Sequence, residues 1–453
     1  MATSNELRVL NQISVYPSPG CATEATLPLT FFDVMWIHGH PVERIFFYSL
    51  PQHYSTTDHF INSIVPSLTS SLSLTLHHFY PLAGKLIRHS PNSKDFAIHY
   101  KHGDSVSFTI AESLADFQAL SSNHPLPFND VYSLVPILDK FSDDSKPLLS
   151  LQVTFFPNAG ISIGITFHHI AGDGSVFGHF LKSWALSCSS SGSVPLLQPP
   201  PVFDKSLVKD PHECYSLFLQ QLFSSPSDQG PGSSKLAVLD DAVCSTFCLG
   251  LEQIQALKKN FSTKSKDNKT PSTFTVVCAY TWVCYVKAQR YSTKERAHFI
   301  FPVDCRGRLK PPLPATFFGN CIRPGHAEED TEKLIGEDGV LVASETIMRT
   351  IDAFKDDAIN DVKEWMEKSI AWVGTGRMLS LAGSPKLGIY ESDFGWGRPT
   401  KVVITSIQKT GAMSLSERRD EDGVEIGFVL PKDIMDEFSS IFSSGLQLLS
   451  GSD

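Results

Sequence analysis

The sequence has little that would mark a membrane, secreted or nucleic-acid-binding protein. Its longest nearly apolar run, residues 276–286, is about half of the ~20 residues that a transmembrane helix needs. The first 20 residues hold no apolar segment of the signal-peptide type, and no C-x-x-C pair occurs among the nine cysteines. Lysine and arginine form no long run, and the formal net charge is −10. We therefore expect a cytoplasmic protein with reduced thiols that binds neither membranes nor nucleic acids.

Several common catalytic signatures are absent as well. The zinc-binding helix pattern H-E-x-x-H does not occur, and no group of cysteines and histidines has metal-ligand spacing. The G-x-S-x-G motif does not occur as the strand-to-helix elbow that presents a serine nucleophile. No cysteine-protease signature is found either. The sequence thus argues against zinc, serine and cysteine hydrolases.

The length and the linker composition predict two domains. The chain has 453 residues, more than the roughly 250–300 at which a single hydrophobic core stops growing. Residues 189–201 and 224–235 are rich in serine, proline and glycine, which is typical of surface connections. We predict an N-terminal domain at 1–188, a crossover linker at 189–235 and a C-terminal domain at 236–453.

Both halves of the chain mix helical and strand patterns. Apolar residues recur at helical spacing in 61–72, and the stretch 148–169 has the pattern of a hairpin around a Pro-Asn-Ala-Gly turn. The second half contains a buried helix pattern at 272–290, strand patterns at 298–306 and 423–430, and a closing amphipathic helix that begins with Pro431. This mixture predicts an α+β fold with mixed sheets.

The stretch FHHIAGDG, residues 167–174, is the first candidate site. If the strand reaches His169, alternation places Phe167 and His169 on one face and His168 on the other. A helical stripe follows Gly174, so the stretch is a strand-to-helix junction with Asp173 or Ser175 as the N-cap.

Three interpretations of this stretch compete. Adjacent strand residues point to opposite faces, so His168 and His169 cannot easily ligate one metal ion. A histidine at the end of a buried strand can act as a general base, and Asp173 could orient its ring or pair with an arginine. A structural histidine with a satisfied hydrogen bond is the third interpretation. The pair His77–His78 has no aspartate at the matching distance, and we expect it to be structural.

A second motif, DFGWG, occupies residues 393–397. Its members Asp393, Gly395, Trp396 and Gly397 precede Pro399. Two glycines around a tryptophan either form a tight loop at a sheet edge or bring backbone close to a ligand.

HHIAGDG and DFGWG together resemble the signature motifs of the plant BAHD acyltransferases, which use acyl-CoA. The similarity extends to LPLTFFD (27–33), HFYPLAGKL (78–86) and VDCRGRL (303–309). TFFGNC (316–321) is similar to the Y-F-G-N-C signature of the branch that acylates anthocyanins and other flavonoid glycosides, with Phe317 in place of tyrosine.

The resemblance implies a fold and a mechanism. The expected fold is α+β, with two chloramphenicol-acetyltransferase-like domains and a solvent channel between them. His169 is expected to be the general base, Asp173 to support the loop by pairing with Arg306, and the Trp396 indole to be a candidate oxyanion donor. Acyl-CoA is a co-substrate, no cofactor or metal is bound, no covalent acyl-enzyme forms, and the protein is a monomer.

The resemblance also proposes binding residues. Lys386, Ser272 and Thr273 are candidates for binding CoA. Phe177, Ser175 and Arg323 are candidates for the donor or acceptor pocket.

The branch favours malonyl-CoA as the donor and a flavonoid or phenolic glycoside as the acceptor. Some malonyl-using relatives carry a cation where Ser175 and Phe177 stand here, so an aromatic donor such as p-coumaroyl-CoA stays an alternative. Two further interpretations are a non-catalytic binding homologue and a peptide-condensation domain, which shares HHxxxDG but lacks DFGWG. The sugar hydroxyl that receives the acyl group is left open.

Overall fold

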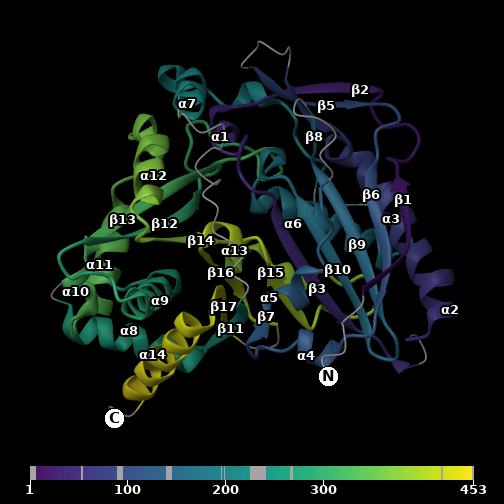
Figure 1. Cartoon of the computed structure of the whole chain (residues 1–453). Helices are drawn as coiled ribbons and strands as arrows, with labels where there is room; N and C mark the ends of the chain where they lie inside the picture. The colour runs from purple at the N-terminus through teal and green to yellow at the C-terminus, as the bar shows by residue number, and fades with distance from the viewer. Residues whose placement is uncertain are drawn as a thin grey trace. The chain divides into compact units, whose positions relative to one another are not determined.

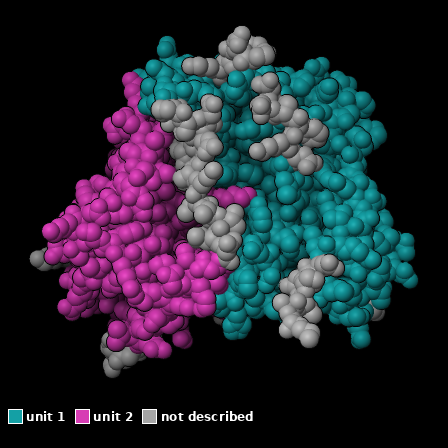
Figure 2. Space-filling model, in the orientation of Figure 1, with its two compact units in different colours: residues 1–234, 313–321, 386–406 teal, residues 235–312, 322–385, 407–453 magenta. Residues whose placement is uncertain are grey.

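The computed structural model describes residues 7–52, 55–88, 95–138, 145–194, 196–197, 199–224, 241–265, 269–419 and 422–450 (Figure 1). It divides into two compact units (Figure 2). Unit 1 comprises residues 1–234, 313–321 and 386–406, and unit 2 comprises 235–312, 322–385 and 407–453. Part of the predicted linker, residues 225–235, lies outside the described residues.

These units differ from the predicted domains in two respects. Residues 189–224 belong to unit 1 and contain helix α7 (Cys214–Phe223), so they are not merely a linker. Two segments of the predicted C-terminal domain, 313–321 and 386–406, also belong to unit 1. The physical reason for the second is strand pairing, since β15 (Lys401–Ile404) is antiparallel to β3 (Val42–Ser49).

Unit 1 is built on a mixed sheet. Its strand order is β1-β6-β9-β10-β3-β15, in which β6 and β9 are parallel. The bounds of the four strands not yet given are Leu7–Val15 for β1, Val106–Ser113 for β6, Leu149–Phe156 for β9 and Gly160–Phe167 for β10. Every residue of β9 and β10 is buried, and the two form the predicted hairpin.

A second, smaller sheet of unit 1 has the order β2-β5-β4-β8. Its strands are Glu24–Pro28 (β2), Phe96–Lys101 (β5), Lys85–Arg88 (β4) and Ser145–Pro147 (β8), and β7 spans Leu126–Pro127. The helices of unit 1 besides α7 are α1 (Phe31–Val34), α2 (Thr57–His59), α3 (Val65–His78), α4 (Phe117–Leu120), α5 (Phe128–Tyr132) and α6 (Gly174–Ser189). Helices α3 and α6 pack against each other, and the Trp184 indole donates a hydrogen bond to the carbonyl of Leu68.

Unit 2 has its own mixed sheet, in the order β13-β12-β14-β16-β17-β11. The strands are Ile322–Asp330 (β13), Arg296–Asp304 (β12), Met378–Ala382 (β14), Ala412–Glu417 (β16), Gly423–Pro431 (β17) and Ala242–Gly250 (β11). The helices are α8 (Leu251–Lys264), α9 (Thr273–Gln289), α10 (Thr331–Ile335), α11 (Gly339–Asp352), α12 (Trp365–Gly374), α13 (Ile407–Thr410) and α14 (Lys432–Ser450).

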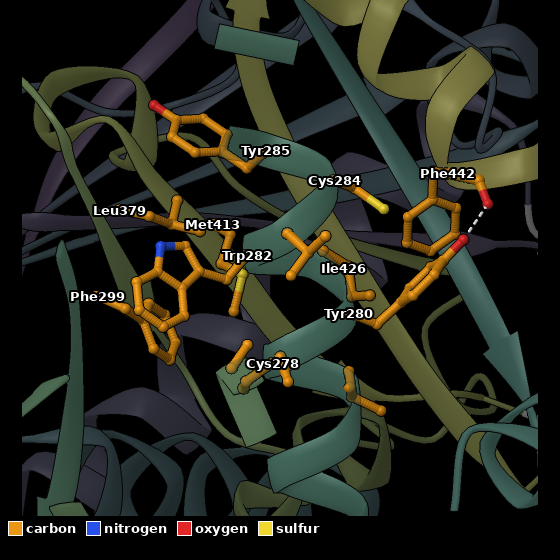
Figure 3. Close-up of a cluster of buried hydrophobic side chains, with 14 of the residues drawn as sticks. Cys278, Tyr280, Trp282, Cys284, Tyr285, Phe299, Leu379, Met413, Ile426 and Phe442 are labelled. Atoms are coloured by element: carbon orange, nitrogen blue, oxygen red, sulfur yellow. Dashed lines mark hydrogen bonds between the residues drawn. The ribbon is translucent and has the colours of Figure 1, made fainter. Parts of the chain in front are cut away.

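Helix α9 forms the centre of the core of unit 2. It packs among α8, α11 and α14 (Figure 1). Its Trp282 ring stacks 5.7 Å from Phe299, and the Tyr280 hydroxyl donates to the carbonyl of Phe442 (Figure 3). A helix buried on all sides needs apolar residues on all sides, which is what 276–286 supplies.

Both units therefore combine a mixed sheet with helices, and the predicted α+β class is confirmed. The predicted helices at 272–290 and after Pro431 correspond to α9 and α14. Among the described residues, none of the helices has both the length and the hydropathy to cross a bilayer.

Candidate active site

The FHHIAGDG stretch connects β10 to α6, as predicted. Strand β10 ends at Phe167, a 3-10 turn covers His169–Ala171, and α6 begins at Gly174. The strand ends before the histidines, so the alternation argument, which required the strand to reach His169, does not apply to them. The two imidazoles nevertheless have different partners.

His168 has a structural environment. Its side chain is buried, and Nδ1 accepts a hydrogen bond from the backbone N–H of Ile170 at 3.2 Å. Burial, together with the charge of Lys146, lowers the pKa of His168 to about 3. The ring is thus neutral and caps the turn that positions the next residue.

His169 is held by two side chains of unit 1. Its ring stacks on the Trp36 indole, with 3.6 Å between ring centroids and 7° between planes. Its Nδ1 lies 3.0 Å from Asn320 Oδ1. The Asn320 amide nitrogen in turn donates to the carbonyl of His169 at 2.9 Å and to Asp33 Oδ1 at 2.9 Å.

These contacts fix the tautomer of His169. Carbonyl and carboxylate oxygens only accept hydrogen bonds, so the side of Asn320 that faces them must be its NH2 group. Asn320 Oδ1 therefore faces Nδ1, which must carry the proton. The lone pair of the neutral ring is then on Nε2, the atom available to take a proton from a substrate.

The protonation state of His169 also suits a base. Burial lowers the pKa of His169, and the nearby Arg44 adds to this shift. Asp173 and the hydrogen bond to Asn320 oppose it, but the pKa remains below its usual range. Since an imidazole with a lowered pKa is neutral near pH 7, His169 is ready to accept a proton.

Asp173 anchors the loop between β10 and α6. Its Oδ1 accepts from the backbone N–H of Ser175 at 3.0 Å, so Asp173 is the N-cap of α6. Its Oδ2 accepts from the backbone N–H of Cys321 at 2.9 Å. This geometry favours the structural role expected for Asp173. Arg306 belongs to unit 2, where Nη1 is 3.2 Å from Asp304 Oδ1, and its pairing with Asp173 stays a prediction.

The DFGWG motif forms a tight loop. Asp393 Oδ1 accepts from the backbone N–H groups of Gly395 and Gly397 at 2.7 and 2.9 Å. Both glycines have positive φ, 103° and 95°, which other residues rarely adopt. The buried Phe394 ring packs edge-on against Tyr48 and Trp184.

The contacts of this loop place it far from His169 along both β10 and α6. The Trp396 ring lies 6.1 Å from Tyr48, which pairs with Ile161, six residues before the end of β10, or about 20 Å along the strand. Trp184, which contacts Phe394, lies 11 residues along α6 from Asp173, or about 16 Å. The motif is therefore at the far end of β10 and α6, and the oxyanion role expected for Trp396 has no geometric support.

The candidate pocket residues have varied surroundings. Phe177 is buried, with the Arg44 guanidinium 4.3 Å from its ring centroid, so it packs in the core of unit 1 rather than at an open face. Ser175 lies beside a narrow pocket that His179 and Phe317 also line.

Arg323 is engaged in unit 2. Its guanidinium is 2.8 Å from Asp361 Oδ2, donates to the carbonyl of Ala358 at 3.0 Å and covers the Phe354 ring at 4.0 Å. Its side chain is only 2% exposed. Arg323 therefore stabilises unit 2 locally, and the structure does not present it as a cation for a substrate.

The CoA-binding candidates are not brought together within either unit. Lys386 lies in unit 1, in the 3-10 turn Pro385–Leu387, whereas Ser272 and Thr273 lie in unit 2. The Ser272 hydroxyl caps α9 by accepting from the backbone N–H of Thr275 at 3.1 Å. Their role toward CoA stays a prediction. In the described part of the chain, no three His, Cys, Asp or Glu residues are grouped to hold a metal ion.

Sequence reasoning missed Asn320, Asp33 and Trp36. Asn320 and Asp33 stand in the segments TFFGNC and LPLTFFD, which carry the resemblance but were given no chemistry. Asn320 contacts His169 across 151 residues of sequence and Asp33 across 287, and no local pattern reveals either contact. The control pair His77–His78 ends α3, where His77 Nδ1 is 3.2 Å from Ser18 Oγ, a structural arrangement as predicted.

Known structures show the same fold. Vinorine synthase matches with a TM-score of 0.71 at 23% identity, over 95% of this chain and 96% of that one. TRI101 of F. sporotrichioides, in complex with coenzyme A and T-2, matches with a TM-score of 0.65 at 14% identity, over 92% and 97% of the two chains. These matches confirm the predicted fold of two acyltransferase-like units with mixed sheets.

Sequence relatives define the family. The Transferase family model matches residues 7–444. The chain is 37% identical to phenolic glucoside malonyltransferase 1 of Arabidopsis thaliana, with 98% of each chain covered. It is 36% identical to coumaroyl-CoA:anthocyanidin 3-O-glucoside-6''-O-coumaroyltransferase 1 of the same plant, with 97% of each covered. It is 37% identical to malonyl-coenzyme A:anthocyanin 3-O-glucoside-6''-O-malonyltransferase of Dahlia pinnata, over 97% of this chain and 98% of the relative. At this identity across nearly its whole length, the chain belongs to the Transferase family, as its resemblance to the BAHD acyltransferases predicts, and is an acyl-CoA-dependent acyltransferase.

Proposed function

We propose that the protein transfers an acyl group from acyl-CoA, with malonyl-CoA preferred, to a sugar hydroxyl of an anthocyanin or another phenolic glycoside. The observation that carries the chemistry is the fixed tautomer of His169, whose Nδ1 faces Asn320 Oδ1 at 3.0 Å. The support for the substrates is the set of relatives, which act on anthocyanin and phenolic glucosides with malonyl or coumaroyl donors.

The mechanism follows from the unprotonated Nε2 atom, since the proton of the neutral ring is on Nδ1. His169 takes the proton from the acceptor hydroxyl as the oxygen attacks the thioester carbonyl. The tetrahedral intermediate then collapses and the C–S bond breaks. The CoA thiolate that leaves takes the proton from the imidazolium, which regenerates neutral His169. Asn320 Oδ1 stabilises that imidazolium by accepting from Nδ1–H, and the Trp36 indole holds the ring plane. No covalent acyl-enzyme is needed, because the acceptor attacks the donor directly.

The donor is the open part of the proposal. Arg323 is bound within unit 2 and Phe177 is buried, so neither candidate decides between the two donors. We retain malonyl-CoA, which serves two of the three relatives described above. The alternative is a p-coumaroyl donor, as in the third relative.

One experiment tests both donor and mechanism. Purified protein is assayed with malonyl-CoA and p-coumaroyl-CoA against one flavonoid glucoside, as the wild type and as the His169→Ala variant. We expect a higher kcat/KM with malonyl-CoA, and we expect His169→Ala to lose at least about 10²-fold in kcat while it still binds CoA. The matched control is His78→Ala, which alters the other histidine pair and should keep wild-type turnover. A preference for p-coumaroyl-CoA would select the alternative donor, and full turnover by His169→Ala would exclude the general-base mechanism.

Two further expectations from the sequence complete the proposal. The protein is proposed to be cytoplasmic and monomeric. A fluorescent fusion in plant cells and the molar mass measured by light scattering test them.

A further inference from the structure

A buried ion pair lies beside Asn320. Lys205 Nζ is 3.3 Å from Asp33 Oδ2, and the two side chains are 4% and 0% exposed. Asp33 belongs to the short helix α1, whereas Lys205 begins the 3-10 turn Lys205–Leu207, inside the stretch that the sequence predicts to be a linker. A buried ion pair contributes little net stability compared with apolar residues of the same size, so stability alone does not account for this one.

The Asp33 carboxylate divides its two oxygens between different partners. Oδ2 accepts from the backbone N–H and the hydroxyl of Thr30, at 2.8 and 2.9 Å, and faces the Lys205 ammonium. Oδ1 accepts from the backbone N–H and the amide nitrogen of Asn320, at 3.0 and 2.9 Å. Because Lys205 and Thr30 hold Oδ2, the carboxylate cannot rotate away from Asn320.

Lys205 also fits closely against the loop that carries Asn320. Its ammonium lies 5.2 Å from the centre of the Phe317 ring. A Cβ atom at Gly319 would overlap Lys205 Nζ, and Gly319 has a φ of 143°. The loop 317–320 therefore closes over the ammonium at a position where only glycine leaves room.

We propose that Lys205 and Asp33 are positioning residues for the proton-accepting histidine. Lys205 fixes the Asp33 carboxylate, the carboxylate fixes the side of Asn320 that carries NH2, and Asn320 Oδ1 then holds the Nδ1–H tautomer of His169. This inference rests on the proposed role of His169 as the base and adds two residues that never touch the substrate. A wrong tautomer would present an N–H where the acceptor hydroxyl needs a lone pair.

A double-mutant cycle separates this role from a structural one. Lys205→Met is made in the wild type and in the Asn320→Ala background, and kcat is measured at saturating donor and acceptor on folded protein quantified by a thermal melt. We expect Lys205→Met to lower kcat about 10-fold or more in the wild type with the KM for acyl-CoA nearly unchanged, and less than about 2-fold in the Asn320→Ala background. The same factor in both backgrounds, or no loss in the wild type, would overturn the proposal.

The matched control is Lys85→Met. Lys85 Nζ lies 3.5 Å from Asp104, another carboxylate that is mostly buried, but this pair bridges β4 and the turn after β5 rather than the Asn320 loop. We expect Lys85→Met to keep wild-type kcat. An equal loss of kcat in Lys85→Met would show that removing a paired lysine acts through general destabilisation, and it would also overturn the proposal.

A second variant covers the case in which Lys205→Met does not fold. Asp33→Asn with Lys205→Met removes both buried charges, which is tolerated better than removing one. An amide at 33 presents only one acceptor atom and brings N–H groups toward Thr30 or Asn320, so kcat is again expected to fall in the wild type and not further in Asn320→Ala. Retention of wild-type kcat by this double variant would overturn the role of the carboxylate.

The His169→Ala variant distinguishes failure of this inference from failure of the proposed function. If His169→Ala keeps turnover, the general-base function fails and this inference fails with it. If His169→Ala is inactive while Lys205→Met has wild-type kcat, the base assignment stands and only the positioning role of Lys205 fails.

Discussion

At the scale of single residues, the hydrogen-bond partner of His169 differs from the one that the motif indicates. The H-x-x-x-D spacing draws attention to Asp173, yet the Asp173 oxygens accept from the N–H groups of Ser175 and Cys321. The hydrogen bond at Nδ1 goes to Asn320 instead. The amide oxygen of Asn320 accepts a hydrogen bond from Nδ1–H but carries no charge, so His169 keeps the lowered pKa that burial imposes.

Replacing Asn320 by Ala tests this arrangement. The hydrogen bond to Asn320 raises the pKa of His169, so its loss should lower that pKa further and move the acid limb of the kcat/KM profile to lower pH. The plateau of kcat should fall about 10- to 100-fold, because the tautomer is no longer fixed. The measurement is a pH–rate profile with the preferred donor. An acid limb that moves to higher pH would contradict the assigned hydrogen bond.

What the sequence predicted at this scale depended on locality. The N-cap role of Asp173 was predictable, because a strand pattern, a glycine turn and a helical stripe lie within about 20 residues of each other. The assignment of His169 as the base came from the resemblance to the BAHD acyltransferases, since the local pattern alone left a structural histidine open. Asn320, Asp33 and Lys205 were not, because their contacts join segments 172 and 287 residues apart. The surroundings of Arg323 were not predicted either, since its partner Asp361 lies 38 residues further along the chain.

At the scale of elements, the DFGWG loop joins the end of α6 to the sheet of unit 1. Phe394 packs on Trp184 of α6 and Tyr48 of β3, and the Tyr48 hydroxyl donates to the carbonyl of Ser392 at 2.9 Å. The hairpin of β9 and β10 followed from alternation and turn residues. The end of β10 at Phe167 could not be predicted from these patterns, because the side chain of His168 caps the turn that ends the strand.

Trp396→Phe tests the structural role of this loop. The change removes the indole N–H but keeps an aromatic ring beside Tyr48, so kcat should stay within about 3-fold of the wild type. Loss of an oxyanion donor would cost about 10²- to 10³-fold. Phe394→Ala is the companion variant, and it should lower the free energy of unfolding by about 3–5 kcal/mol, because Phe394 is buried. Steady-state kinetics and denaturant unfolding give the two values, and a 10²-fold loss of kcat in Trp396→Phe would restore the catalytic role.

At the scale of the whole molecule, the chain builds unit 1 from three separate segments. Residues 313–321 bring Asn320 to His169, and residues 386–406 bring β15 to the edge of β3. Composition predicted a connection between two domains at 189–235, because serine, proline and glycine cluster there. Composition could not predict that 313–321 and 386–406 belong to unit 1, because these segments are short and carry no linker composition.

The segmental assembly of unit 1 predicts how a truncated chain behaves. A fragment ending at residue 224 keeps the first segment but lacks β15 and Asn320. Without β15, the edge of β3 at Phe46 and Phe47, which are fully buried in the intact chain, is left unpaired and exposed to water. We expect the fragment to aggregate or to show no cooperative thermal transition by circular dichroism, while the full chain melts cooperatively. A fragment ending at residue 188, the predicted domain boundary, should behave no better. A cooperative melt of either fragment would show that the first segment is a domain by itself, as composition alone suggests.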